Sequence, residues 1–181
     1  MKEKLKNWVI KYHVQIITIT LMVVIGTLMH FVTGIFDNEV ATKILGVIFP
    51  INETTWEHMK MLWYPFMVAG IILAIKKNDS SYFSGFVFGG LISIPMILGL
   101  FAFYQSFTIH SVLILDIIIF LVVMILCALL AFDLVKLPIM KKALVASIIV
   151  AILVTALLIT LTYVPGDGYV FLDNSGYEHE H

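Results

Sequence analysis

The sequence contains no arginine and one cysteine, and only 13% of its 181 residues are charged. Because Cys127 is alone, the chain can form neither an intramolecular disulfide nor a cysteine-based zinc site, and we interpret it as a small packing residue. The basic residues are all lysine and form no patch of the kind that binds nucleic acid. There is no glycine-rich nucleotide-binding loop and no low-complexity region. These absences argue against nucleic acid and nucleotide partners.

Apolar residues dominate instead. They make up 61% of the sequence, and the mean hydropathy is +1.03. A soluble domain of this size could not bury that much apolar surface, and no polar stretch is long enough to form a separate soluble domain. The sequence therefore predicts an all-α integral membrane protein, a single transmembrane domain over residues 1–181 whose main partner is the lipid bilayer.

Five segments have the length and apolar character of transmembrane helices. They cover about Val14–Thr33, Trp56–Ile75, Phe83–Tyr104, Val112–Phe132 and Ala143–Tyr163, which leaves residues 164–181 as a tail. The first segment lacks a small-x-small cleavage site before a polar region, so we expect a retained span rather than a signal peptide.

The lysines predict the orientation of this five-helix bundle. Lys43 falls on one side of the predicted membrane, Lys60 lies inside a span, and the remaining nine lysines fall on the other side. The positive-inside rule places those nine in the cytoplasm. We therefore expect a multi-pass protein of a bacterial cytoplasmic membrane, with its N-terminus inside and its C-terminus outside.

The segment Asn52–Lys60 concentrates the chemistry of the chain. It carries two carboxylates, an imidazole and an amine, and it leads directly into the second predicted span. Ionisable groups at a membrane boundary are costly, and they usually face a bundle interior or a watery pocket. A functional site, if the chain has one, is expected around this segment.

Histidines from three spans are predicted to meet at the same outer depth. His30 lies near the outer end of the first span, His58 at the start of the second, and His110 at the start of the fourth. With the carboxylate of Glu57 they would suit Zn²⁺ or another divalent cation. Glu57 or Glu53 would then be the candidate general base for a metal-bound water.

Other polar residues at this depth are expected to support the site. They are Asn52, Trp56, Lys60, Tyr64, Tyr104 and Asp116. Asp116 is ranked below His110, because six helical residues separate the two side chains by about 120°.

Each of these residues also has a purely structural interpretation. Thr54-x-x-Glu57 fits a capping box, which alone would explain Glu57, and Asn52 fits a cap or turn. Lys60 could snorkel to the outer surface. Each histidine taken singly is better explained by a hydrogen bond between helices than by a metal.

Two further patterns concern packing. Gly85, Gly89 and Ser93 place small residues on one face of the third span, which favours close helix contact and offers a face for oligomerisation. The loop Gly34–Ile51 is apolar in its second half but too short to span the membrane. It could be a lid over an outer pocket or a packed surface loop, and the packed loop is slightly favoured.

The pattern Asn52-Glu53-x-x-Trp56-Glu57-His58-x-Lys60 resembles a family of small, uncharacterised membrane proteins of Gram-positive bacteria with an N-E-[ST]-x-W-E-H-x-K signature. The resemblance extends over most of the chain, although Gly166-Asp167-Gly168 departs from a more proline-rich pattern. It implies one fold over the whole length and no particular activity.

Three functions remain open on the sequence alone. The leading one is an outward-facing polar pocket for a small ligand or cation, with or without a bound metal. The second is a membrane-embedded, metal-dependent hydrolase acting on a lipid-type substrate. The third is a structural or assembly protein whose polar cluster only stabilises the bundle.

Overall fold

The computed structural model describes residues 2–32, 35, 39–108 and 112–171. The helices are α1 (Lys2–Val32), α2 (Glu39–Leu45), α3 (Thr55–Lys77), α4 (Ser81–Gln105), α5 (Leu113–Val135), α6 (Pro138–Lys142), α7 (Leu144–Tyr163) and the short 3₁₀ helix η2 (Tyr169–Phe171).

Five of these helices are long and apolar enough to cross a membrane. They are residues Tyr12–Val32 of α1 and the whole of α3, α4, α5 and α7. The predicted all-α class with five apolar helices is therefore confirmed. Each predicted span overlaps one of these helices, with ends that differ by a few residues.

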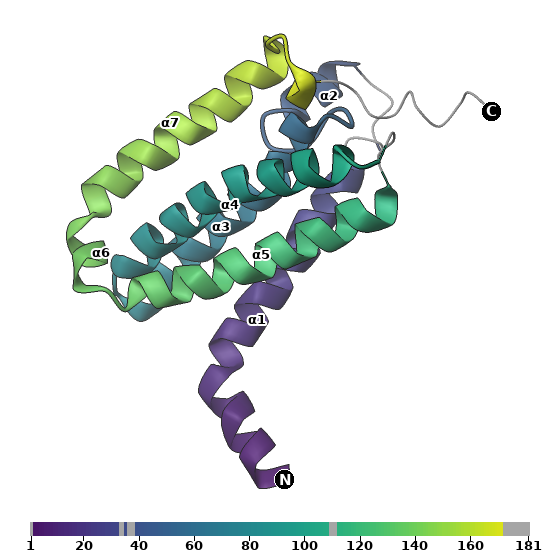
Figure 1. Cartoon of the computed structure of the whole chain (residues 1–181). Coiled ribbons are helices and arrows are strands. Elements are labelled where there is room, and N and C mark those ends of the chain that lie inside the picture. The colour runs from purple at the N-terminus through teal and green to yellow at the C-terminus, as the bar shows by residue number, and fades with distance from the viewer. Residues whose placement is uncertain (1, 33–34, 36–38, 109–111, 172–181) are drawn as a thin grey trace.

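The bundle is built around α3 and α4, which pack against each other along their lengths (Figure 1). Helix α1 contacts α3 and α5, whereas α7 contacts α4 and α3. The first half of α1 extends away from the other helices. The C-terminal end of α1 and the start of α3 are neighbours, which is the arrangement that matters for the site.

The turn between α3 and α4 shows why the chain reverses direction there. Asn78 ends α3 in the left-handed conformation, with φ 50°, which asparagine tolerates better than most residues. The backbone N–H of Ser81 then donates to the Asp79 carboxylate at 3.1 Å, and this hydrogen bond lowers the pKa of Asp79. As a result α4 begins at Ser81, two residues before the predicted start of that span.

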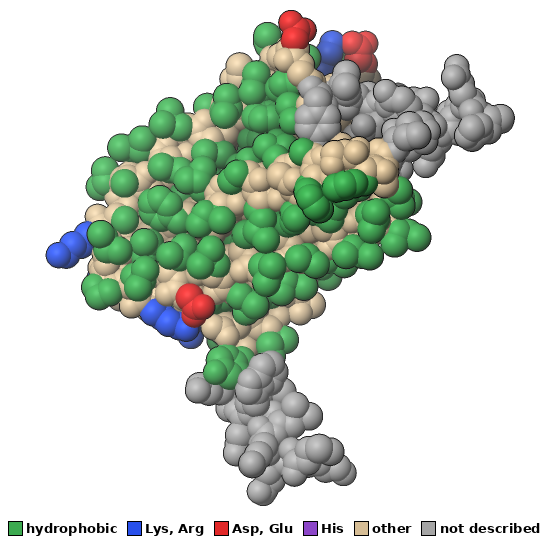
Figure 2. Space-filling view, viewed as in Figure 1, with side chains coloured by type: hydrophobic (Ala, Val, Ile, Leu, Met, Phe, Trp, Pro, Cys, Tyr) green, Lys and Arg blue, Asp and Glu red, His purple; other side chains and the backbone are tan. Residues whose placement is uncertain are grey.

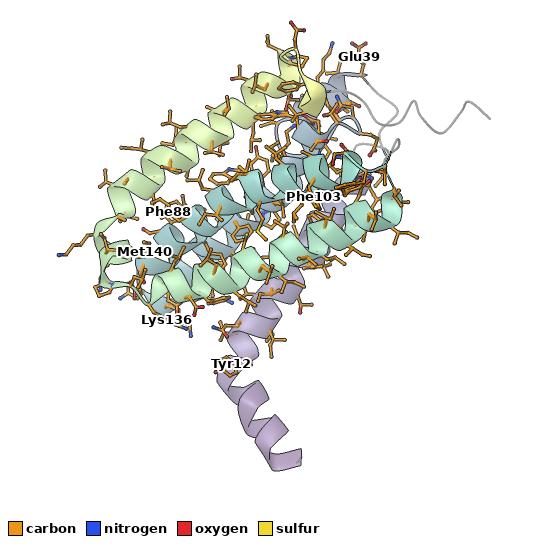
Figure 3. All side chains as sticks on the ribbon, viewed as in Figure 1. Tyr12, Glu39, Phe88, Phe103, Lys136 and Met140 are labelled. Atoms are coloured by element: carbon orange, nitrogen blue, oxygen red, sulfur yellow. The ribbon has the colours of Figure 1, made fainter. Side chains whose placement is uncertain are left out.

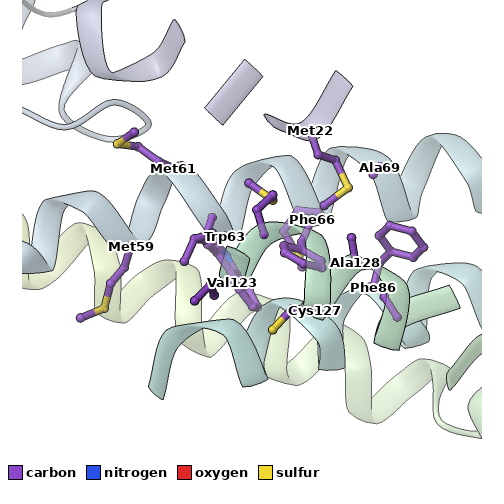
Figure 4. Packing of buried hydrophobic residues seen from close by; sticks show 14 of the residues in the cluster. Met22, Met59, Met61, Trp63, Phe66, Ala69, Phe86, Val123, Cys127 and Ala128 are labelled. Carbon is purple, nitrogen blue, oxygen red and sulfur yellow. The ribbon is translucent and has the colours of Figure 1, made fainter. Parts of the chain in front are cut away.

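The core lies where α3, α4 and α5 meet. Its largest fully buried apolar side chains include Trp63, Phe66 and Phe86 (Figure 4). The indole N–H of Trp63 donates to the Thr155 hydroxyl at 2.9 Å, which joins α3 to α7 inside the apolar part of the bundle. Pairing these two groups avoids leaving a polar atom unsatisfied in a membrane.

The small residues of α4 pack inside the chain. A Cβ atom on Gly85 would lie 2.7 Å from Val135, and one on Gly89 would lie 2.8 Å from Ala131, both on α5. Ser93 is fully buried and donates its hydroxyl to the Gly90 carbonyl. The close helix contact predicted for this face is therefore made with α5 of the same chain.

Charged side chains mark the two ends of the bundle. Hydrophobic side chains cover most of the face seen in Figure 2, and the few charged groups in view lie near helix ends. We call one end the lysine end, after Lys76, Lys77, Lys136, Lys141 and Lys142, and the other the Glu53 end. Figure 3 shows Lys136 and Glu39 at these opposite ends.

Candidate functional site

Two histidines and a glutamate meet at the Glu53 end. His30 comes from the last turn of α1, His58 from the first turn of α3, and Glu53 from the loop just before α3. One ligand atom from each side chain can be chosen so that all three lie within 4.8 Å of one another. In the described part of the chain this is the one such group of three, and we call it the His-Glu-His cluster.

The distances within the cluster are close to those of a metal site. His58 Nε2 lies 3.5 Å from one Glu53 oxygen, and His30 Nε2 lies 3.7 Å from the other. Tetrahedral zinc with bonds of about 2.0–2.1 Å holds its ligand atoms about 3.3 Å apart. Small side-chain movements would therefore bring these atoms around one ion. The side chains are partly exposed, at 27% for His30, 24% for His58 and 48% for Glu53, so solvent reaches them.

The backbone fixes the orientation of the His58 ring. Its Nδ1 atom lies 2.7 Å from the carbonyl oxygen of Thr54, one helical turn earlier. A carbonyl can only accept, so Nδ1 carries the proton and donates it. In the neutral imidazole the lone pair is then on Nε2, which is directed toward Glu53. A carbonyl that holds the remote N–H of a ligating histidine is a common feature of metal sites.

This tautomer leaves two acceptors facing each other. The Nε2 lone pair of neutral His58 and a carboxylate oxygen of Glu53 are 3.5 Å apart, and neither has a proton to give to the other. A metal ion bound by both atoms would make the contact favourable. The cluster is therefore suited to binding a cation.

His30 completes the cluster from the neighbouring helix. Its ring centroid lies 5.3 Å from that of His58 and 5.2 Å from that of Phe31. Its Nδ1 atom is buried and has no hydrogen-bond partner among the described residues. Because His30 belongs to α1 and His58 to α3, an ion bound by both would link the two helices.

Glu57 belongs to a different network. Its carboxylate is 2% exposed and accepts hydrogen bonds from Lys60 at 2.7 Å, the Thr162 hydroxyl at 2.8 Å and the backbone N–H of Ile51 at 3.0 Å. Successive residues of a helix point about 100° apart. Glu57 therefore faces α7 while His58 faces α1, and the structure places Glu53 rather than Glu57 beside the imidazoles.

The capping box is half formed. The Thr54 hydroxyl accepts from the backbone N–H of Glu57 at 3.3 Å, as an N-cap does. The Glu57 carboxylate reaches Ile51 instead of the Thr54 N–H. The Thr54 N–H donates to the side-chain oxygen of Asn52 instead. Asn52 therefore stabilises the turn before α3.

Lys60 does not snorkel to the surface. Its side chain is fully buried, and its ammonium donates to the Gly46 carbonyl at 2.6 Å as well as to Glu57. A third partner, the Phe49 carbonyl, lies at 3.5 Å. Both carbonyls belong to the turn that follows α2, so the buried lysine binds the end of this short helix to α3.

Two tyrosines hold the same loop. Tyr64 of α3 donates to the Val47 carbonyl at 2.5 Å, and Tyr163 at the end of α7 donates to the Lys43 carbonyl. The exposed pair of Glu39 and Lys43 adds a side-chain hydrogen bond that lowers the pKa of the Glu39 carboxyl. These contacts match the packed surface loop and leave no sign of a lid in the described part of the loop.

The remaining predicted residues lie elsewhere. Tyr104 of α4 donates to the carboxylate of Asp116 on α5, so Asp116 is held within a helix pair. Trp56 packs against Phe171 of η2, with ring centroids 5.4 Å apart and the ring planes tilted by 40°. His110 lies outside the described residues. Thr162 and the Gly46 carbonyl were missed, because a threonine near a helix end and a backbone carbonyl carry no distinctive signal in a sequence.

Comparison with known proteins places the chain in a family but gives no activity. A family of unknown function, DUF6512, matches residues 1–178. No curated protein matches the chain, and no solved structure matches it. The argument for a function therefore rests on the geometry at the Glu53 end.

Proposed function

Since the chain belongs to DUF6512, whose function is unknown, we propose from its own geometry that it binds a divalent metal ion at a membrane surface through His30, Glu53 and His58. The observation that carries the proposal is the orientation of His58. Its Nδ1–H is held by the Thr54 carbonyl, so its Nε2 lone pair and the Glu53 carboxylate face a common point that suits a cation.

The donor atoms favour zinc or a similar borderline metal. Two imidazole nitrogens and one carboxylate oxygen suit Zn²⁺, whereas Mg²⁺ and Ca²⁺ prefer oxygen ligands alone. Three protein ligands leave at least one position of a tetrahedral ion open to water or to a ligand. The His-Glu-His cluster would thus bind a cation together with a small outer ligand.

The proposed location follows from the lysines. Nine of eleven lie toward the lysine end or in the N-terminal segment that precedes the first span, and the positive-inside rule puts that end in the cytoplasm of a bacterial cell. The His-Glu-His cluster is then on the outer face of the plasma membrane. This location gives it access to extracellular metal.

The hydrogen bonds of Glu57 favour a metal-binding function over hydrolysis. A metal-dependent hydrolase needs a general base beside the metal-bound water. The sequence offers Glu57 for that role, but its carboxylate is engaged by Lys60, Thr162 and the Ile51 backbone. Glu53 is itself beside both imidazoles. We therefore propose a metal-binding role rather than a catalytic one.

Metal analysis after equilibrium dialysis tests the proposal. Because the C-terminal Glu178-His179-Glu180-His181 could bind metal on its own, the assay is done with both tail histidines replaced by alanine. We expect one zinc per chain in this background. His58→Ala and Glu53→Gln should each weaken zinc binding by at least about tenfold, since even outer-shell changes at metal sites cost this much.

His13→Ala is the matched control. It removes an imidazole from α1, the helix that carries His30, but at the opposite end of the apolar segment. Zinc binding should be unchanged in this variant. Equal zinc content in the His58, Glu53 and His13 variants would refute the proposed site.

A further inference from the structure

The His-Glu-His cluster lies at the level where apolar helix gives way to loop. His30 is two residues from the end of the apolar segment Tyr12–Val32, and His58 is in the first turn of the apolar helix α3. Glu53 is in the loop just outside. In a bilayer this boundary corresponds to the lipid head groups, which flank the roughly 30 Å hydrocarbon core.

One side of the cluster is open to lipid. Phe31 contacts His30 edge-on, with ring centroids 5.2 Å apart, and its own side chain is 60% exposed. Leu28, one turn earlier on α1, is also exposed. Helix α1 is peripheral, and little of its apolar segment is buried inside the protein. The imidazoles therefore adjoin an apolar surface that would contact acyl chains.

With a metal ion bound, the net charge of the His-Glu-His cluster would favour binding of an anion. A divalent metal with one carboxylate and two neutral imidazoles retains one positive charge. The other described cations at this end are occupied, because Lys43 pairs with Glu39 and the buried Lys60 pairs with Glu57. A bound metal would thus be the principal positive centre there, with an open coordination position.

We infer that the metal at this site binds the phosphate group of a membrane lipid, whose acyl chain lies along Phe31. The inference rests on the proposed metal site. Phosphate oxygen is a suitable ligand for the open position, and the depth of the cluster brings lipid phosphates to it. Free phosphate offers the same ligand atoms, so the test must separate an amphiphilic phosphate from an inorganic one.

Cobalt substitution allows a direct measurement. Co²⁺ takes the place of zinc, and its visible absorption reports a change in coordination. The purified protein in a phosphate-free maltoside detergent is loaded with Co²⁺ and titrated with dioctanoyl phosphatidic acid or with inorganic phosphate. We expect phosphatidic acid to change the spectrum at concentrations at least about tenfold lower, equivalent to about 1.4 kcal/mol from the apolar contact.

Variants at Phe31 test the apolar contribution. Phe31→Ser should remove the advantage of phosphatidic acid without changing the response to inorganic phosphate, and Phe31→Leu should restore it. Phe103→Ser is the matched control, because Phe103 is a similarly exposed phenylalanine on α4 (Figure 3). It should leave both titrations unchanged.

The other outcomes are distinct. Equal affinity for the two phosphates would overturn the lipid assignment and leave free phosphate as the ligand. A bound Co²⁺ whose spectrum responds to neither would overturn the inference while the metal site stands. Failure to bind either Co²⁺ or Zn²⁺ would overturn the proposed function itself.

Discussion

The Lys60 ammonium and the Glu57 carboxylate form an ion pair that is shut off from solvent. Their atoms are 2.7 Å apart, and the side chains are 0% and 2% exposed. Each charged group also has a second hydrogen-bond partner. The Glu57 carboxylate accepts from the Thr162 hydroxyl, and the Lys60 ammonium donates to the Gly46 carbonyl. The pair therefore joins α3 to α7 and to the turn after α2.

Removing the negative charge of this pair should be strongly destabilising. Glu57→Gln keeps the shape of the side chain but leaves the buried ammonium of Lys60 without its anion. Breaking a buried pair costs ~3–5 kcal/mol, whereas losing a helix cap costs ~1 kcal/mol. We expect the larger loss in the free energy of unfolding, seen as a lower melting temperature in detergent.

The exposed pair on α2 supplies the control. Glu39→Gln removes a carboxylate that also pairs with a lysine, but both side chains are in solvent, where ion pairs contribute little. Its melting temperature should stay near that of the wild type. A Glu57→Gln protein that melts like the Glu39→Gln protein would show that the folded state does not depend on the charge of Glu57 to balance Lys60.

The cap and the metal site can be separated at Thr54. Thr54→Ala removes the hydroxyl that accepts from the Glu57 N–H, so the free energy of unfolding should fall by about 1 kcal/mol. The orientation of His58 depends on the Thr54 carbonyl, which every residue has. Zinc affinity should therefore be retained in Thr54→Ala, and Thr54→Ser should restore stability. A large loss of zinc affinity in Thr54→Ala would contradict this account of the site.

Zinc should stabilise the folded protein by linking two helices. A ligand that binds only the folded state adds about 2.7 kcal/mol at a concentration of one hundred times its Kd. We expect zinc to raise the melting temperature of the wild type and of His13→Ala, but not that of His30→Ala. If His30→Ala responds to zinc as the wild type does, the bound ion does not lie between α1 and α3.

The sequence predicts the membrane helices well because their length is set by the bilayer. All five predicted spans overlap helices of the structure, since apolar runs of this length leave few alternatives. Which of these helices pack against one another is less predictable. The contact between α7 and α3 depends on single polar groups, such as Trp63 and Thr155, whose pairing no periodicity indicates.

The candidate site likewise has features that the sequence predicts and features that it does not. The shared depth of His30 and His58 follows from their places at span ends, and the structure brings them together. The choice between Glu53 and Glu57 does not follow. The sequence does not show that α3 begins only at Thr55, which leaves Glu53 in the loop beside α1, or that Glu57 faces α7. The role of Lys60 could not be predicted either, since its partners include backbone carbonyls.

Because α4 and α5 pack closely, alanine should destabilise the protein at one glycine of α4 and not at another. A methyl group at Gly85 would lie 2.7 Å from Val135 and 2.9 Å from the Ala131 carbonyl, whereas one at Gly99 meets nothing within 4 Å. Gly85→Ala should cost about 1–3 kcal/mol through overpacking. Gly99→Ala should be neutral or slightly stabilising, because alanine favours helix. Thermal melting of the two variants in detergent would check this, and equal melting would place Gly85 away from α5.

The proposed orientation in the membrane predicts which loops can be labelled from outside the cell. Ser80 lies in the turn at the lysine end, and Gly168 follows α7 at the Glu53 end, with no atom within 4 Å of a Cβ placed on it. Both positions should therefore tolerate cysteine in a Cys127→Ala background. An impermeant thiol reagent should modify Gly168→Cys in intact cells and Ser80→Cys only after the membrane is opened, because the lysines favour the cytoplasmic side. Modification of both cysteines from the same side would contradict five spans. Modification of Ser80→Cys alone from outside would reverse the orientation and place the His-Glu-His cluster in the cytoplasm.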